Sequence, residues 1–106
     1  MGDKMYYTYM LRCCDNSIYT GIASDIDKRM SEHFSQNEKC AKYTRTHRPK
    51  KLEALWLSDN RSTASKLEYH IKRLTKKQKE ELIQTKSLSL LRDKIPVENY
   101  SYIQKT

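Results

Sequence analysis

Two tyrosines, an arginine and a histidine are spaced so that a small fold can bring them to one place. Tyr9 and Tyr19 lie on two neighbouring stretches whose residue types are typical of strands. Arg29 and His33 follow four residues apart, a spacing that places both on one face of a helix. A guanidinium stabilises phosphoryl charge, and a phenolate or an imidazole accepts a proton from water. Together these residues predict a site that binds and attacks a phosphate.

A glutamate within an apolar helical stripe is a further candidate. Ala64, Leu67 and Ile71 recur at helical spacing, and Glu68 falls on the same face. Because an unpaired buried carboxylate is costly, we expect Glu68 to have a partner: an arginine, a hydroxyl or a metal ion. A structural ion pair with Arg29 or a hydrogen bond to a tyrosine is the alternative to a metal site.

Residues 39–51 carry many basic side chains with aromatic and hydroxyl residues between them. No acidic residue occurs between Glu38 and Glu53. This mixture suits contact with phosphates and stacking on bases, whereas a merely solvated loop is the alternative. The predicted DNA-binding residues are Lys42, Tyr43, Thr44, Arg45 and Arg48 from this stretch and Lys72 from a later helix.

The elements that must position these side chains follow from hydrophobic periodicity. Strands are expected over residues 5–12, 18–21 and 52–57, the first two as an antiparallel hairpin. A helix is expected over residues 63–74, and a T-x-x-Q capping box at Thr75 begins another that runs to about residue 85. The sequence thus predicts an α+β fold with a three-stranded antiparallel sheet flanked by helices, in the order β-β-α-β-α-α.

The segment between the second and third strands is predicted to turn sharply into a helix. Gly21 should end the strand where the backbone bends or a ligand comes close, and Ser24 is a plausible N-cap. Ile26, Met30 and Phe34 then recur at a spacing of four, which predicts the buried stripe of this helix.

The tyrosine motifs and the later arginine resemble a known superfamily. Tyr7-Thr8-Tyr9, Tyr19-Thr20-Gly21 and Arg29 are similar to the GIY-YIG endonuclease pattern. Within this superfamily, the chain resembles small single-domain proteins similar to the N-terminal nuclease domain of the bacterial excision-repair excinuclease. The resemblance covers about four-fifths of the chain, so we divide it into a nuclease domain, residues 1–86, and a C-terminal extension, residues 87–106, whose aromatic residues fit an edge strand or a loose tail.

The resemblance implies a role for each candidate residue. Tyr19 would be the general base, with His33 as a rival, and Tyr9 would position the water or Tyr19 by a hydrogen bond. Arg29 would stabilise the phosphoryl charge. Glu68 would bind Mg²⁺ or Mn²⁺, and one carboxylate suffices in principle because magnesium keeps several waters.

The sequence departs from the family pattern in both triplets and just after the second. Tyr7 replaces a glycine, and Thr8 and Thr20 replace isoleucines, which we interpret as changes in packing. Repair-type members carry a lysine where Ile22 stands, so a cation beside Tyr19 must come from elsewhere. Candidates for that cation are Lys72, Lys42 and Arg45.

Composition agrees with a nucleic-acid partner. The 106 residues suffice for one domain, and 21 Lys and Arg against 13 Asp and Glu give a net charge of +8. No apolar run approaches the length of a membrane span, no signal peptide is recognisable, and three cysteines without metal spacing indicate reduced thiols. We therefore expect a cytoplasmic protein, a monomer with DNA as its partner and room for a protein partner that targets it.

Three functions are compatible with these observations. The first is a metal-dependent DNA endonuclease that acts in repair or processing. The second is a nucleic-acid-binding module of the same fold that no longer cleaves. The third is a protein-interaction domain that uses residues 39–51, and it would bind its partner with little dependence on salt.

Overall fold

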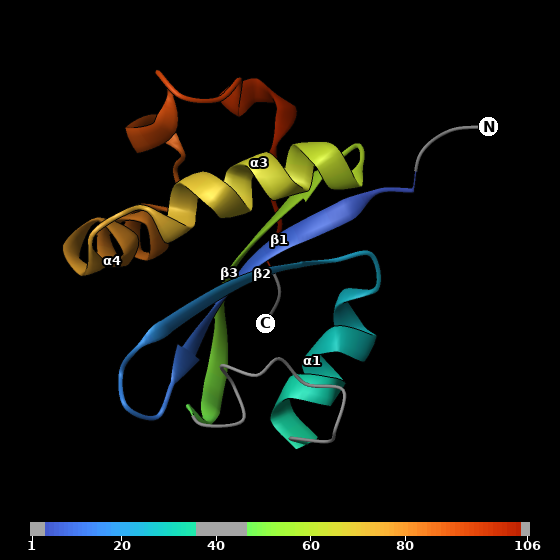
Figure 1. Cartoon of the computed structure of the whole chain (residues 1–106), viewed down its shortest axis with the longest axis vertical. Coiled ribbons are helices and arrows are strands. Elements are labelled where there is room, and N and C mark those ends of the chain that lie inside the picture. Colours follow the sequence, from blue (N-terminus) through green and yellow to red (C-terminus); the bar gives the residue numbers. More distant parts are fainter. Residues whose placement is uncertain (1–3, 36–46, 105–106) are drawn as a thin grey trace.

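A four-stranded antiparallel sheet organises the protein (Figure 1). The computed structural model describes residues 4–35 and 47–104. The strands are β1 (Tyr6–Cys13), β2 (Ile18–Ala23), β3 (Pro49–Ser58) and β4 (Ser101–Tyr102), in the spatial order β2-β1-β3-β4. The predicted α+β class and the antiparallel hairpin are confirmed. The fourth strand is a difference from the predicted three, because the end of the chain returns to pair with β3.

Helices cover both faces of the sheet. α1 (Ile26–Ser35) lies on one face, and α3 (Arg61–Lys72) lies on the other, with α4 (Lys76–Thr85) beyond its end (Figure 1). The Asn60 side chain caps α3 by accepting a hydrogen bond of 2.9 Å from the backbone N–H of Thr63. The predicted capping box of Thr75 and Gln78 opens α4. No helix in the described part of the chain is long and apolar enough to cross a membrane.

Alternating residues of the strands pack into two hydrophobic cores, one on each face of the sheet. On the α3 side, Met10 and Trp56 pack with Leu67, Ile71 and Leu82. On the α1 side, the buried residues are Tyr9, Leu11, Ala23, Ile26 and Leu55. Because neighbouring strand residues point to opposite faces, the odd-numbered tyrosines Tyr9 and Tyr19 share the face that α1 covers.

The buried stripe of α1 differs from the predicted one. Ile26 is buried and Met30 packs beside it, but Phe34 is 44% exposed and His33 is fully buried. Eight residues along an α-helix advance about 80° beyond whole turns, whereas seven fall about 20° short. A residue seven positions after Ile26 therefore faces the sheet better than one eight positions after it, and His33 takes the place predicted for Phe34.

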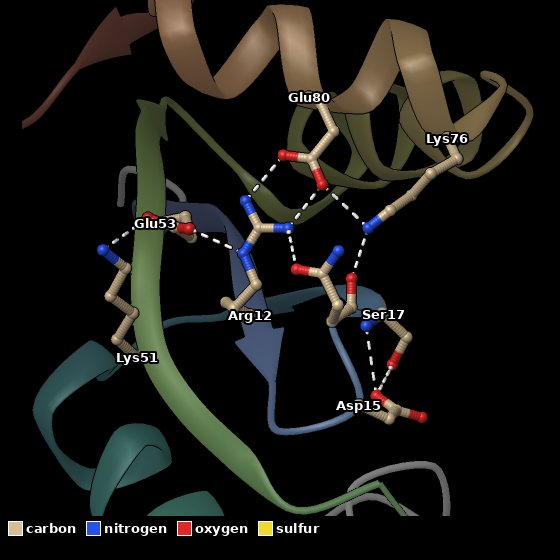
Figure 2. A network of polar contacts seen from close by, with 8 residues as sticks. Arg12, Asp15, Ser17, Lys51, Glu53, Lys76 and Glu80 are labelled. Atoms are coloured by element: carbon tan, nitrogen blue, oxygen red, sulfur yellow. Dashed lines mark hydrogen bonds and ion pairs between the residues drawn. The ribbon is translucent and has the colours of Figure 1, made fainter.

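An arginine near the end of β1 joins the hairpin to α4 (Figure 2). The Arg12 guanidinium binds both carboxylate oxygens of Glu80 and donates from Nε to Glu53 at 2.8 Å. Lys76 pairs with Glu80 at 2.7 Å and also donates to the backbone carbonyl of Asn16 in the β1–β2 turn. This network fixes α4 against the end of the hairpin.

The C-terminal extension packs against the sheet as an ordered segment. It forms two short 3₁₀ helices, Ser89–Leu91 and Val97–Asn99, before β4. The Tyr100 hydroxyl donates to the Thr63 carbonyl at 2.7 Å, and the Tyr102 ring meets Trp56 edge-on. Of the two alternatives for this segment, the structure has the edge strand.

Candidate active site

The edge of the sheet at β2 brings the predicted aromatic residues together. The hydroxyl of Tyr9 and Nε2 of His33 form a buried hydrogen bond of 2.8 Å. The ring of Tyr19 lies with its centroid 6.2 Å from that of Tyr9 and 5.5 Å from that of His33. Tyr9 is 1% exposed and His33 is fully buried, whereas Tyr19 is partly exposed. Tyr19 is thus the member of this trio that solvent reaches.

Gly21 makes this cluster possible by lacking a side chain. A Cβ at this position would lie 2.6 Å from the Tyr9 hydroxyl oxygen and 3.0 Å from Cε2 of Tyr19. Gly21 sits inside β2 with a negative φ, so it does not end the strand at a bend as predicted. The close approach predicted for it is real, but the groups that approach are the two tyrosine rings.

Burial sets the protonation states of the hydrogen-bonded pair. Burial raises the pKa of the Tyr9 phenol, and nearby Tyr19 raises it further, while Arg29 opposes the shift. Burial and the charge of Arg29 lower the pKa of His33 from 6.5 to about 4, against the effect of Glu32. Near neutral pH, Tyr9 is therefore a neutral phenol and His33 is a neutral imidazole. The tautomer of His33 determines which of the two donates the hydrogen bond.

Arg29, on α1, lines an open cleft whose lining includes none of Tyr9, Tyr19 and His33. Its guanidinium donates a hydrogen bond of 2.8 Å to the Glu32 carboxylate. Glu32 was not among the residues predicted from the sequence. Burial alone would lower the pKa of Arg29, but its contacts with Glu32 and Tyr9 raise it instead, so the side chain stays charged. The cleft has a volume of about 370 Å³, and its lining includes the basic residues Lys28 and Arg61 and the acidic residues Asp25 and Glu32 as well as Arg29.

The second group of candidate residues reaches the same edge from α3. Nζ of Lys72 lies 5.8 Å from the centroid of the Tyr19 ring and 3.2 Å from Oε2 of Glu68. The Glu68 side chain is 23% exposed, because α3 turns it from the core towards the edge of the sheet. Glu68 was expected to have a partner, and within the described residues that partner is Lys72, not Arg29 or a tyrosine.

A metal at this position would rely on a small set of protein ligands. No group of three or more histidine, cysteine, aspartate or glutamate residues within the described ranges could hold a metal ion. Glu68 is a partly exposed carboxylate, and magnesium commonly takes one or two carboxylates and completes its shell with water. The donor set therefore fits a hydrated Mg²⁺ or Mn²⁺ and not a closed structural site.

The structure describes only some of the predicted DNA-binding residues. Arg48 is exposed just before β3, where its carbonyl accepts a hydrogen bond of 2.7 Å from the N–H of Cys14. Beside it, Nδ1 of His47 lies 2.6 Å from Asp15, a contact that no sequence pattern indicated. The four residues that lie outside the described ranges are Lys42, Tyr43, Thr44 and Arg45.

The departures from the family pattern have different structural settings. The Thr8 hydroxyl donates to the Ala64 carbonyl at 3.1 Å and so ties β1 to α3. Thr20 is buried, and its hydroxyl has no hydrogen-bond partner among the described residues. Ile22 lines the cleft beside Arg29, and Lys72 brings a cation to Tyr19 from another element.

The comparison with protein families agrees with this geometry. Residues 5–81 match the family model of the GIY-YIG catalytic domain, and the chain belongs to this family. The match begins before β1 and ends within α4, so it contains Tyr9, Tyr19, Arg29, His33 and Glu68.

Individual relatives extend the likeness over most of the chain. A UPF0213 protein of Fusobacterium nucleatum is 51% identical over 88 residues, covering 83% of this chain and 85% of the relative. One from Clostridium perfringens is 44% identical over 85 residues, covering 79% and 88%. The solution NMR structure of a UPF0213 protein from Bacillus halodurans matches with a TM-score of 0.51 and 37% identity, covering 85% of this chain and 94% of that one. The names of these relatives state a family and no activity.

Proposed function

We propose that this protein is a divalent-metal-dependent DNA endonuclease that hydrolyses phosphodiester bonds in DNA repair or processing. The observation that carries the proposal is the position of Tyr19. Its ring contacts the rings of the buried Tyr9–His33 pair, and Nζ of Lys72, which binds Glu68, lies 5.8 Å from its centroid. Membership of a family defined by its catalytic domain supports the same reaction class.

Tyr19 is the general base that this arrangement favours. A base must reach the water whose proton it takes, and Tyr19 is partly exposed whereas His33 is fully buried. The ammonium of Lys72 lies 5.8 Å from the centroid of the Tyr19 ring and would attract negative charge that develops on this side chain. As its phenolate, Tyr19 would take a proton from water and become the neutral phenol; the resulting hydroxide would attack phosphorus, and the bond from phosphorus to the leaving oxygen would break.

The remaining site residues position Tyr19, bind the metal ion and neutralise charge on the substrate phosphate. Arg29 stays charged beside the cleft and would stabilise the phosphoryl oxygens. Tyr9 and His33 fix the surroundings of Tyr19 and are positioning residues because burial keeps them from the substrate. Glu68 would hold the Mg²⁺ or Mn²⁺, which when bound neutralises charge at the leaving oxygen.

A nicking assay with matched variants tests this function. Supercoiled and branched DNA are incubated with the protein, with and without Mg²⁺ or Mn²⁺. We expect metal-dependent nicking that falls at least about a hundredfold in Glu68→Gln and Tyr19→Phe, since each removes a group that acts in the transition state. Glu81→Gln is the control, because Glu81 is an exposed glutamate on α4. Nicking that survives in folded Glu68→Gln and Tyr19→Phe would contradict the proposal.

A nucleic-acid-binding module without cleavage is the second candidate. It is favoured by Ile22, which stands where repair-type relatives carry a lysine. On this alternative, every DNA substrate stays intact in the presence of metal. The protein still binds DNA, and its affinity falls steeply with salt, with a slope of roughly −0.9 per phosphate contact on duplex DNA.

A further inference from the structure

The outer face of α3 carries an exposed tyrosine next to the proposed metal ligand. Tyr69 is 56% exposed, which is a large apolar area for a side chain in the middle of a helix. It directly follows Glu68, so its side chain projects about 100° further round the helix and about 1.5 Å along it. The side of α3 that carries Glu68 and the side that carries Tyr69 therefore adjoin each other.

A cleft lies beside this tyrosine, between α3 and the C-terminal extension. The extension runs along the side of α3 that faces away from the sheet (Figure 1). The cleft has a volume of about 300 Å³ and is lined by Tyr69, His70, Arg73, Leu74, Leu91 and Lys94. Its lining combines aromatic and apolar side chains with two cations, and none of these six residues is acidic.

Neighbouring side chains hold the tyrosine ring in place. The guanidinium carbon of Arg73 lies 5.3 Å from the ring centroid of Tyr69, within the range of a cation–π contact. The His70 ring meets the same ring edge-on, with centroids 5.1 Å apart. An exposed ring that is already ordered loses little conformational freedom when a flat ligand stacks on it.

We propose that this cleft binds a single-stranded DNA segment adjacent to the cleavage site, with one base stacked on Tyr69 and the backbone held by Arg73 and Lys94. The inference rests on the proposed DNA endonuclease function and names its substrate class: DNA with an unpaired segment beside the scissile bond. An aromatic platform flanked by cations is the usual arrangement for sequence-independent binding of single strands.

Charge and position together favour this occupant. The two cations in the lining are Arg73 and Lys94, and the whole chain carries a net charge of +8. An anionic partner gains from both. A strand that leaves a phosphate near Glu68 needs to pass only a quarter turn around α3 to reach Tyr69. Bases in a duplex are already stacked on each other, so only an unpaired base can use the platform.

Binding of a fluorescent oligonucleotide tests the inference independently of cleavage. The measurement uses the full chain with Glu68→Gln and no metal, so that the DNA stays intact. A single strand containing 2-aminopurine should be quenched on binding as the base stacks. We expect Tyr69→Ala to weaken single-strand binding about tenfold and to abolish the quenching, with duplex binding changed less than about twofold. Arg73→Ala and Lys94→Ala should each reduce the salt slope by about 0.7.

Two controls separate the ring from its hydroxyl and from charge in general. Tyr69→Phe keeps the ring and should retain both affinity and quenching. Lys77→Ala removes an exposed positive charge outside the cleft and should leave the quenching unchanged.

The result that overturns the inference is a Tyr69→Ala protein that binds and quenches the single strand like its parent. Wild-type protein that nicks DNA yet does not bind single strands would also overturn it while leaving the endonuclease proposal intact. Conversely, Tyr69-dependent quenching without nicking by the wild type would keep the binding site and remove the endonuclease function.

Discussion

The protonation state of the buried histidine next to the Tyr9 hydroxyl depends on the fold. His33 is fully buried and shares a hydrogen bond with Tyr9. Protonating it would place a second positive charge near Arg29 in a site with little water. Burial and that charge lower its pKa from 6.5 to about 4. Near neutral pH, the Tyr9–His33 hydrogen bond therefore joins a neutral imidazole to a phenol.

The stability of the protein should consequently fall on mild acidification. The unfolded chain takes up a proton on His33 below its ordinary pKa of 6.5, whereas the folded chain resists until about 4. The free energy of unfolding is thus fully retained above pH 6.5 and is lost as the pH falls towards 4. From about pH 7.5 to about pH 5 we expect a loss of about 2 kcal/mol, measured by urea unfolding.

His33→Gln provides the comparison for this pH dependence. We expect it to be less stable than the wild type at neutral pH, and the part of the slope due to the imidazole to disappear. Glu80 does not confuse the measurement, because its pKa is lowered to about 2 by the hydrogen bond from Arg12, so its contribution is lost only below pH 4.5. An equal slope in the variant and the wild type would show that His33 is not the titrating group.

Gly21 sets the distance between the two strands' tyrosines, so replacing it should disturb the site directly. In Gly21→Ala, the new methyl group would lie 2.6 Å from the hydroxyl oxygen of Tyr9, whose side chain is buried. We expect a loss of about 2 kcal/mol of unfolding free energy in urea denaturation. Because the hydroxyl is the nearest atom, the loss should shrink when Gly21→Ala is made in a Tyr9→Phe background.

A small substitution at an exposed helical position, away from the tyrosine rings, supplies the control. Ser31→Ala on α1 should change stability by less than about 0.5 kcal/mol. If Gly21→Ala costs the same with and without the Tyr9 hydroxyl, the contact with the hydroxyl is not the reason for the glycine, and the contact with the ring carbon Cζ, at 2.8 Å, is what remains.

At the scale of elements, one arginine determines how α4 meets the hairpin. The Arg12 side chain is 14% exposed and binds Glu53, which is 12% exposed, and Glu80, which is 36% exposed. In Arg12→Met, the Glu53 carboxylate loses that partner while it remains mostly buried, so we expect a loss of about 2 kcal/mol. Glu80→Gln should cost less than about 1 kcal/mol, because its carboxylate is more exposed.

Hydrogen exchange distinguishes a local effect from a global one. If the Arg12 network fixes α4, amide protection in Lys76–Thr85 should fall more than protection in β1. Lys77→Met, on the exposed side of α4, should leave both unchanged. A uniform loss of protection in Arg12→Met would instead mean that the arginine supports the whole sheet.

Local patterns predicted the elements and motifs well, because each depends on a few neighbouring residues. The hairpin, the capping box at Thr75 and the α+β class all follow from such patterns. The position of His33 was not predicted, since spacings of seven and eight are both helical and only the sheet beneath α1 decides between them. The Arg12–Glu80 pair joins residues far apart in sequence, which no periodicity reveals.

The candidate site was predictable in its residue types more than in its contacts. Two tyrosine triplets indicated Tyr9 and Tyr19. That both rings occupy the space left by the missing side chain of Gly21 follows only from the strand register, which pairs Tyr9 with Gly21. Lys72 was one of three candidate cations for Tyr19. Its proximity to the ring depends on the angle at which α3 crosses β2, and tertiary packing sets that angle.

For the whole molecule, the C-terminal extension is the segment whose importance composition understates. It contributes four buried side chains to the α3-side core, namely Leu88, Leu91, Ile95 and Tyr100. It also pairs β4 with β3 and brings the Tyr102 ring edge-on against Trp56. The family model ends at residue 81, so the matched region alone lacks this cover.

Removing the extension should therefore unfold the protein. Burial of four large apolar side chains contributes at least about 6 kcal/mol before the cost of ordering the segment. That is comparable to the entire stability of a small domain, about 5–15 kcal/mol. We expect a chain that ends at Thr85 to lack a cooperative urea transition and near-ultraviolet circular dichroism, because Trp56 loses its fixed surroundings.

A single-atom change calibrates that expectation. Tyr100→Phe removes only the hydrogen bond to the Thr63 carbonyl and should cost about 1 kcal/mol while the transition stays cooperative. If the shortened chain instead unfolds cooperatively at the same urea concentration as the full one, the extension is an accessory. In that case the first 85 residues form a complete core, and the cleft beside Tyr69 loses one wall without loss of the fold.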